Sequence, residues 1–219
     1  MHVLFRTFGC KANQYDTERM RQEAEALGAS AVSQGADAQV CVVNTCTVTN
    51  QADADARRFI RRIRRENPGI EVVVAGCSSA LKPEAYRAME GVVAVVEGHD
   101  PVEVAQATVR RGEGAGCRPI QRPGNDPGLV QLKGGAAPKI LSPEPLGGDL
   151  LRRREGGTRG WLKIQDGCDR KCSFCGKRLA RGKSRSRPAS ELVKEARLMS
   201  HAHPELVLTG IHIGHYGRD

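Results

Sequence analysis

The fold is decided by residues 40–77, which read VCVVNTCTVTNQADADARRFIRRIRRENPGIEVVVAGC. The apolar runs at residues 40–43 and 72–75 are rich in valine and predict two buried strands. Between them, apolar side chains recur at helical spacing and predict one buried helix face, made of Ala52, Ala56, Phe59, Ile60 and Ile63. The turn residues at 67–69 end that helix. A strand, a helix and a second strand in this order indicate parallel strands of one sheet.

The same alternation extends to both sides of this stretch. Residues 3–5 and 92–96 predict further buried strands. After the second of these, Asp100 is a predicted helix N-cap, Pro101 occupies the first helical position and Glu103 completes a capping box. We therefore expect residues 1–111 to form an α/β domain, a doubly wound parallel sheet covered by helices on both faces.

The chain changes character after this domain. Glycine and proline recur over residues 112–157 and the periodicity fades, which indicates a linker. Over residues 158–219 we expect a strand at 161–164, a cysteine-bearing loop, a helix after Pro188 and a strand at 206–208. The helix should bury one face, made of Ala189, Leu192, Val193, Ala196 and Met199.

The composition is that of a soluble globular protein. The 219 residues are 39% hydrophobic and 27% charged. No apolar stretch approaches the roughly 20 residues that cross a bilayer. Residues 1–6 contain neither a charged leader nor the apolar core of a signal peptide. We therefore expect a cytoplasmic protein with no membrane partner.

The net charge of +9 is concentrated in residues 152–187, where thirteen Lys and Arg residues accompany three acids. Such a segment attracts a polyanion such as tRNA with salt-dependent affinity. The candidate RNA contacts are Arg181, Lys183, Arg185 and Arg187, and the alternative is a solvated loop. For the basic run at 57–65, a solvated helix face over a buried stripe is the favoured interpretation. Aromatic residues make up 4% of the chain, which argues against a stacking platform for single-stranded RNA.

Eight cysteines in a chain of this type indicate metal or redox chemistry rather than a disulfide scaffold. Cys168, Cys172 and Cys175 have the spacing C-x₃-C-x₂-C in a short loop. A 4Fe-4S cluster normally takes four cysteines, so three would leave one iron open. The alternatives are inert thiols or a zinc site with a distant fourth ligand, although zinc sites usually come as two separated cysteine pairs.

Cys10, Cys46 and Cys77 each follow a predicted strand. Residues just past the ends of parallel strands meet at the carboxyl edge of the sheet, so three thiolates could hold a second cluster there. Gly9 and Gly76 would let the backbone approach it. The alternative is that these cysteines are small core residues.

The remaining cysteines and the histidines carry no site in this interpretation. Cys41 lies within an apolar strand and is expected to pack in the core, and Cys117 lies in the linker without an identifiable partner. Four histidines lack ligand spacing: His201, His203, His212 and His215.

The C-x₃-C-x₂-C motif, with Phe174 before its last cysteine, resembles that of the radical S-adenosylmethionine superfamily. Three other stretches are similar to the N-terminal domain of the methylthiotransferase family: Phe8-Gly9-Cys10-Lys11-Ala12-Asn13-Gln14, Asn44-Thr45-Cys46-Thr47-Val48-Thr49 and Ala75-Gly76-Cys77. Four more look like the start of its radical domain: Gln165-Asp166-Gly167-Cys168, Ala180-Arg181-Gly182, Ser184-Arg185-Ser186-Arg187-Pro188 and Leu208-Thr209-Gly210-Ile211-His212. Residues 11–14 and 46–49 are most similar to the branch that modifies N6-threonylcarbamoyladenosine in tRNA.

The resemblance implies a transferase that adds a methylthio group to C2 of the adenine next to the anticodon. It implies an auxiliary 4Fe-4S cluster on Cys10, Cys46 and Cys77 that carries the transferred sulfur. It also implies a second 4Fe-4S cluster on Cys168, Cys172 and Cys175 that binds S-adenosylmethionine and forms the radical. The implied partners are tRNA and an electron donor such as flavodoxin or ferredoxin, and the complete enzyme would be a monomer.

The chain also departs from the family pattern. Gly176-Lys177-Arg178-Leu179 stands where the family has an apolar pair and a proline. Residues 158–219 suffice for about two βα units, so we expect an incomplete radical-domain (β/α) barrel, a C-terminally truncated chain and little or no turnover. The alternative functions are a non-catalytic iron–sulfur or zinc protein that binds RNA or passes electrons, and a methylthiotransferase that acts on a ribosomal protein.

Overall fold

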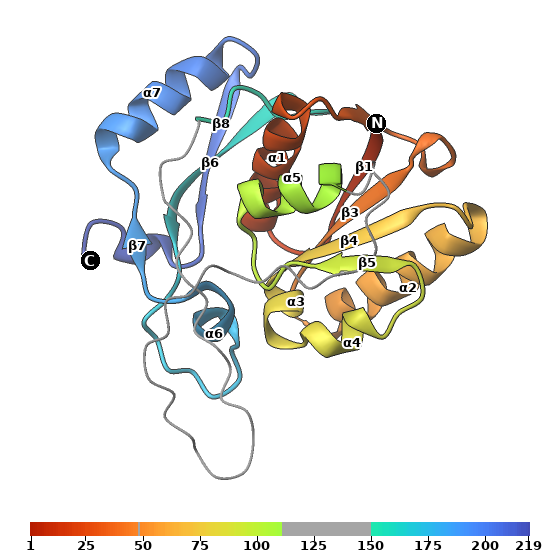
Figure 1. Cartoon of the computed structure of the whole chain (residues 1–219). Coiled ribbons are helices and arrows are strands. Elements are labelled where there is room, and N and C mark those ends of the chain that lie inside the picture. Colours follow the sequence, from red (N-terminus) through yellow and green to blue (C-terminus); the bar gives the residue numbers. More distant parts are fainter. Residues whose placement is uncertain (48, 111–149) are drawn as a thin grey trace.

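The computed structural model describes residues 1–47, 49–110 and 150–219. Its larger sheet has five parallel strands in the order β2-β1-β3-β4-β5, as Figure 1 shows. They are β1 (His2–Thr7), β2 (Ser30–Val32), β3 (Val40–Thr45), β4 (Glu71–Gly76) and β5 (Val92–Val95). The predicted α/β fold with a parallel sheet is confirmed.

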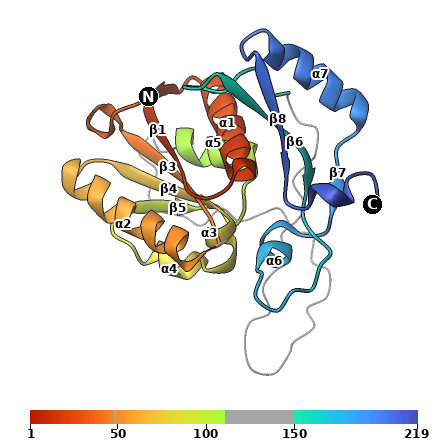
Figure 2. The same cartoon turned by 180° about the vertical axis from the view of Figure 1, so that it is seen from behind.

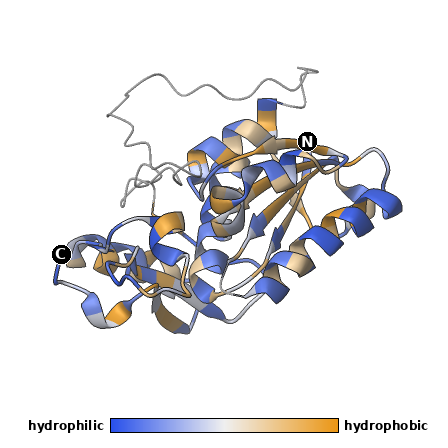
Figure 3. Ribbon diagram, turned by 90° about the horizontal axis from the view of Figure 1, so that it is seen from below, coloured by the Kyte–Doolittle hydropathy of each residue, from blue (hydrophilic) through white to orange (hydrophobic). Residues whose placement is uncertain are grey.

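Helices cover both faces of this sheet, as Figures 1 and 2 show from opposite sides. On one face lie α1 (Lys11–Ala26) and α5 (Pro101–Val109), and on the other lie α2 (Asn50–Glu66), α3 (Cys77–Leu81) and α4 (Pro83–Arg87). Strand β3 is buried along its whole length: Val42 packs with the α1 and α5 side chains, whereas Cys41 and Val43 pack with those of α2. Figure 3 shows these hydrophobic strands between helices whose outer turns are hydrophilic.

Helix α5 begins at its predicted N-cap, and α2 ends at its predicted turn residues. The Asp100 carboxylate accepts hydrogen bonds from Val102 N at 2.9 Å and Glu103 N at 3.2 Å, which caps α5. Helix α2 begins after Thr49, whose hydroxyl accepts from Ala52 N at 3.1 Å, and ends before Asn67. Its buried stripe differs slightly from the prediction because Ala52 is half-buried and Asp53 is buried in addition.

A smaller sheet forms in the second half of the chain. Strands β6 (Arg159–Asp166) and β8 (Glu205–Gly210) lie parallel and are joined through α7 (Ala189–Ser200), which gives one βαβ unit. The loop between β6 and α7 adds α6 (Lys177–Arg181) and the antiparallel strand β7 (Arg185–Ser186), and η3 (Ile213–His215) follows β8.

The predicted buried face of α7 is partly wrong. Leu192 and Met199 are buried as expected, but Ala189 and Val193 are exposed. Glu195 is fully buried in their place because it pairs with Arg187.

The two sheets pack against each other through α1 and β6. Tyr15 of α1 joins Leu151, Trp161 and Met199 in one buried apolar cluster. Within the predicted linker, residues 150–157 hold to α1, since Gln22 Nε2 donates to Leu150 O at 3.1 Å. The rest of that linker, with Cys117, lies outside the described residues.

Among the described residues, no helix combines the length and apolar character that crossing a membrane requires.

Candidate metal centres

The carboxyl edge of the larger sheet brings the first cysteine trio together. Cys10 directly precedes α1, Cys46 follows β3, and Cys77 opens α3 directly after β4. The Sγ atoms of Cys10 and Cys77 lie 3.8 and 3.9 Å from the same acceptor, Asn13 Oδ1. Cys46 lies against Gly9, since a Cβ added there would overlap the Cys46 Sγ.

Asn13 is fixed in place by the backbone around these cysteines. Its Nδ2 donates to Phe8 O at 3.0 Å and to Thr45 O at 2.8 Å. These two bonds turn Oδ1 toward the thiols. The residue is fully buried, and the only signal for it in the sequence is its place in the stretch at residues 8–14.

Glycine is required at two positions of this edge. Gly9 has a φ of +107° and Gly76 a φ of +101°, a region that residues with a Cβ rarely adopt. A Cβ at Gly76 would overlap the Thr45 backbone and the Asn44 side chain. The glycines thus let neighbouring strand ends approach closely at the cysteines.

The donor set suits an iron–sulfur cluster better than a single ion. Across residues 1–47, 49–110 and 150–219, no three His, Cys, Asp or Glu side chains converge on one metal-sized point. The thiolates of a four-iron cube bind separate irons and need not converge in that way. Cys46 and Cys77 are buried, Cys10 is partly so, and the edge carries only thiols as soft ligands.

A buried ionic cluster adjoins this trio. Arg181, the last residue of α6, donates through Nε to Cys77 Sγ at 3.1 Å and through Nη2 to Asn13 Oδ1 at 2.7 Å. The same guanidinium contacts Asp16 at 2.6 Å and Asp166 at 3.0 Å.

Lys163 and His99 complete the ionic cluster. Lys163 Nζ lies 2.5 Å from Asp16 Oδ1 and 2.9 Å from Asp166 Oδ2, and His99 Nε2 lies 3.2 Å from the same Asp166 oxygen. The side chains of all five members are at most 5% exposed.

The ionic cluster shifts the acidities of its members. Burial alone would raise the pKa of Asp166, but Arg181, Lys163 and His99 outweigh it and hold that pKa well below its usual range. At Asp16, burial again acts to raise the carboxyl pKa, but Lys163 and Arg181 outweigh it and lower that pKa. Burial raises the pKa of the Cys77 thiol to about 11, although Arg181 works in the opposite direction. A metal that displaces this proton would gain a thiolate already facing a cation.

The second trio lies in the loop that follows Asp166. Cys168 and Cys175 are half-buried and Cys172 is exposed. Cys168 N donates to Gly182 O at 3.1 Å, and Cys175 N donates to Cys172 O at 3.2 Å. The first bond ties the start of the loop to the C-cap of α6, and the second closes a turn within the loop. Beside this trio, a Cβ added at Gly176 would overlap the Leu81 side chain, which belongs to the helix that Cys77 opens.

Comparison with known proteins finds similar sequences along nearly the whole chain. Residues 2–98 match the family described as uncharacterized protein family UPF0004. Over 99% of its length the chain is 37% identical to the threonylcarbamoyladenosine tRNA methylthiotransferase MtaB of Bacillus subtilis and 31% identical to the protein of the same name from Thermotoga maritima. The chain is similar to the methylthiotransferase family along nearly its whole length.

A further methylthiotransferase relative is the tRNA-2-methylthio-N(6)-dimethylallyladenosine synthase of Halalkalibacterium halodurans, 29% identical over 99% of the chain. The chain spans about half the length of the curated relatives it matches, 45% for both MtaB proteins and 38% for the synthase.

Two of the four residues expected to contact RNA are buried in the structure. Arg181 is fully buried in the ionic cluster. Arg187 Nη2 pairs with Glu195 Oε2 at 2.6 Å, and Arg187 Nη1 donates to the Tyr15 hydroxyl at 3.0 Å. Lys183 is exposed and Arg185 half-buried, so these two remain predictions. Counting charges along the sequence could not show this, because a packed interface between two sheets can bury arginines when carboxylates accompany them.

Proposed function

We propose that this chain holds the two iron–sulfur centres of a tRNA methylthiotransferase. The reaction would replace the C2 hydrogen of N6-threonylcarbamoyladenosine beside the anticodon with a methylthio group. The observation that carries the proposal is that Arg181 contacts both Cys77 of the first trio and Asp166, which lies two residues before Cys168 of the second.

We assign Cys10, Cys46 and Cys77 to the auxiliary 4Fe-4S cluster, and Cys168, Cys172 and Cys175 to the cluster that binds S-adenosylmethionine. When bound, these groups would supply the sulfur atom and the radical chemistry of the transfer. An electron donor such as flavodoxin or ferredoxin would be required.

The protein's part is to hold and enclose the ligands. Asn13 and Arg181 contact the Cys77 thiol, and Arg181 joins that thiol to the buried ionic cluster through Asp16 and Asp166. The open side of the second trio, with Cys172 and Phe174 exposed, leaves room for S-adenosylmethionine and substrate. Residues 1–111 and 158–219 would be two units joined by 112–157.

A tRNA substrate is supported by the names of the relatives, three of which specify tRNA. Two of them specify threonylcarbamoyladenosine, at the higher identities of 37% and 31%. A ribosomal-protein substrate has no comparable support.

Anaerobic reconstitution with iron and sulfide tests the two centres. We expect about eight irons per chain, since each cluster holds four. Replacing either trio with serine should leave about four, whereas Cys41→Ser, in the apolar core, should leave about eight. A chain that stays colourless, or that takes up one zinc ion instead, overturns the proposal.

Nucleoside analysis tests the substrate. In cells that lack the gene, tRNA should contain N6-threonylcarbamoyladenosine with hydrogen instead of a methylthio group at C2. A deletion strain with unchanged tRNA and an altered ribosomal protein would refute the tRNA assignment.

A further inference from the structure

An arginine-rich groove of about 1210 Å³ runs beside α2, outside the candidate metal centres. Its walls include six arginines, Arg6, Arg58, Arg61, Arg62, Arg64 and Arg65, against two acids, Asp55 and Glu90. Phe8 and Phe59 contribute aromatic surface to the same groove.

The groove exists because one helix is absent from this face of the sheet. The connection from β2 to β3 forms only the short η1 (Gly35–Asp37), and β2 pairs with residues 2–4 of β1. Arg6, further along β1, therefore stays exposed beside α2.

Aromatic rings orient two of these arginines without neutralising them. The Arg6 guanidinium lies 5.6 Å from the centroid of the Phe59 ring, and that of Arg62 lies 5.5 Å from it. A guanidinium placed over an aromatic face keeps its positive charge and its planar set of donors. Such a group loses little side-chain freedom when it then binds a phosphate bidentately.

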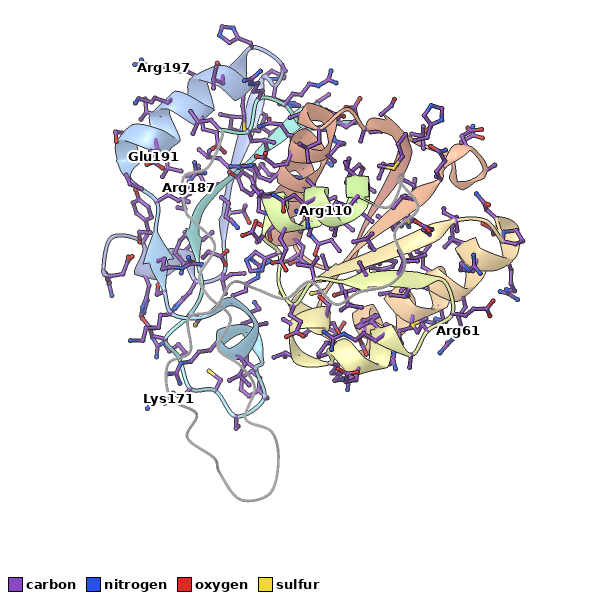
Figure 4. The ribbon with its side chains drawn as sticks, in the orientation of Figure 1. Arg61, Arg110, Lys171, Arg187, Glu191 and Arg197 are labelled. Carbon is purple, nitrogen blue, oxygen red and sulfur yellow. The ribbon has the colours of Figure 1, made fainter. Side chains whose placement is uncertain are left out.

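Neighbouring carboxylates leave much of the positive charge of the groove's arginines available to a ligand. Arg58 and Arg62 pair with acids on the exposed surface, where such pairs contribute little. Arg64 is half-buried, pairs with Glu90 at 3.4 Å and donates to Ile70 O at 3.1 Å. Among the described residues, Arg61 and Arg65 have no ion pair, and both are exposed on the same side of α2. Figure 4 shows Arg61 on the outer side of that helix.

We propose that this groove binds the phosphodiester backbone of RNA. The choice of RNA rests on the proposed function. From Arg58 to Arg65 the helix rises about 10 Å, over which one strand of a duplex carries about three phosphates. Phe8 lines the groove two residues before Cys10, so a bound strand would extend toward the first cysteine trio.

The test is the affinity of the 219-residue chain for an unmodified tRNA transcript, measured by fluorescence anisotropy from about 50 to 200 mM salt. The variant R61A/R65A removes two charges and keeps the helix, because alanine is a strong helix former. The matched control R110A/R197A removes two exposed arginines, one at the C-cap of α5 and one in α7, both labelled in Figure 4.

We expect R61A/R65A to bind about tenfold more weakly and its salt slope to fall by about two, since each phosphate contact contributes about one. The control should bind within twofold of the parent. Equal losses in both variants, an unchanged salt slope, or tighter binding to phosphatidylserine vesicles than to tRNA would overturn the inference.

Iron loading of the same proteins separates this inference from the proposed function. Both variants should take up as much iron as the parent. If both variants load fully with iron and bind tRNA equally well, the groove inference is refuted but the proposed metal centres are not. A groove-dependent affinity in a chain that takes up no iron supports the groove and refutes the metal centres.

Discussion

The Arg181 guanidinium lies 3.1 Å from the Cys77 thiol, although 104 residues separate them along the chain. Arg181 ends a helix of the second unit, and Cys77 follows a strand of the larger sheet. The contact is buried and shared with Asp16 and Asp166, so a cation from one unit is matched by acids from both. The interface is therefore specified by charge pairing as well as by the apolar cluster around Tyr15.

Arg181→Ala should destabilise the chain by about 3 to 5 kcal/mol, because two buried carboxylates, Asp16 and Asp166, would lose one of the cations that balance their charge. Arg181→Lys keeps the charge but loses the planar donor set, so we expect an intermediate loss. Urea unfolding gives the free energies. Lys183→Ala, two residues away and exposed, is the control and should change stability by under about 0.5 kcal/mol. A loss below about 1 kcal/mol for Arg181→Ala contradicts the prediction.

Stability should fall as the pH drops below about 5. Asp16 and Asp166 have lowered pKa values in the folded chain, so the unfolded chain binds protons first as acid is added. Their contribution is present above the ordinary carboxyl pKa of about 3.9 and is lost as the pH falls through the lower folded values.

The check on this pH dependence is a series of urea unfolding curves between about pH 3 and 7. Asp166→Asn should flatten the acid limb relative to the parent, because one of the shifted groups no longer titrates. Glu90→Gln, at a side chain that is 93% exposed, should leave the limb unchanged. An equally steep acid limb in Asp166→Asn would show that this carboxylate is not the source.

Glu195→Ala should cost about 3 to 5 kcal/mol, since Arg187 would remain buried without its carboxylate. Val193→Ala, on the same helix and 49% exposed, should cost under about 0.5 kcal/mol. Unfolding curves of the two variants compare the positions directly. Similar losses at both would mean that Val193, as the hydrophobic pattern predicted, faces the interior.

The strands and the cysteine positions could be predicted because local pattern determines them. Parallel strands covered on both faces are continuous apolar runs, and residues 40–43 and 72–75 show this plainly. Once the strands are known, the topology places Cys10, Cys46 and Cys77 at one edge.

The ionic cluster could not be predicted in this way, because it depends on how two units pack. Asp16 and Arg181 are 165 residues apart, and the sequence around each of them does not indicate that it is buried. On α7 a local sign did exist. Glu195 lies three residues after Leu192 and four before Met199, on the same helical stripe, whereas the apolar character of Val193 pointed to the wrong face.

The thiols of the metal-free, reduced chain should react with iodoacetamide in order of exposure and acidity. Cys172 is exposed and should be modified first. Cys41 is fully buried, and burial raises the pKa of its thiol to about 12, so at about pH 8 it should react only when the chain unfolds. Peptide mass spectrometry over time gives the order, and labelling in urea shows that every thiol can react. Loading with iron and sulfide should then protect Cys172 and leave the slow rate of Cys41 unchanged, because only the former is a proposed ligand. If Cys172 reacts equally fast before and after loading, it does not bind the metal, and the second trio is not a cluster site.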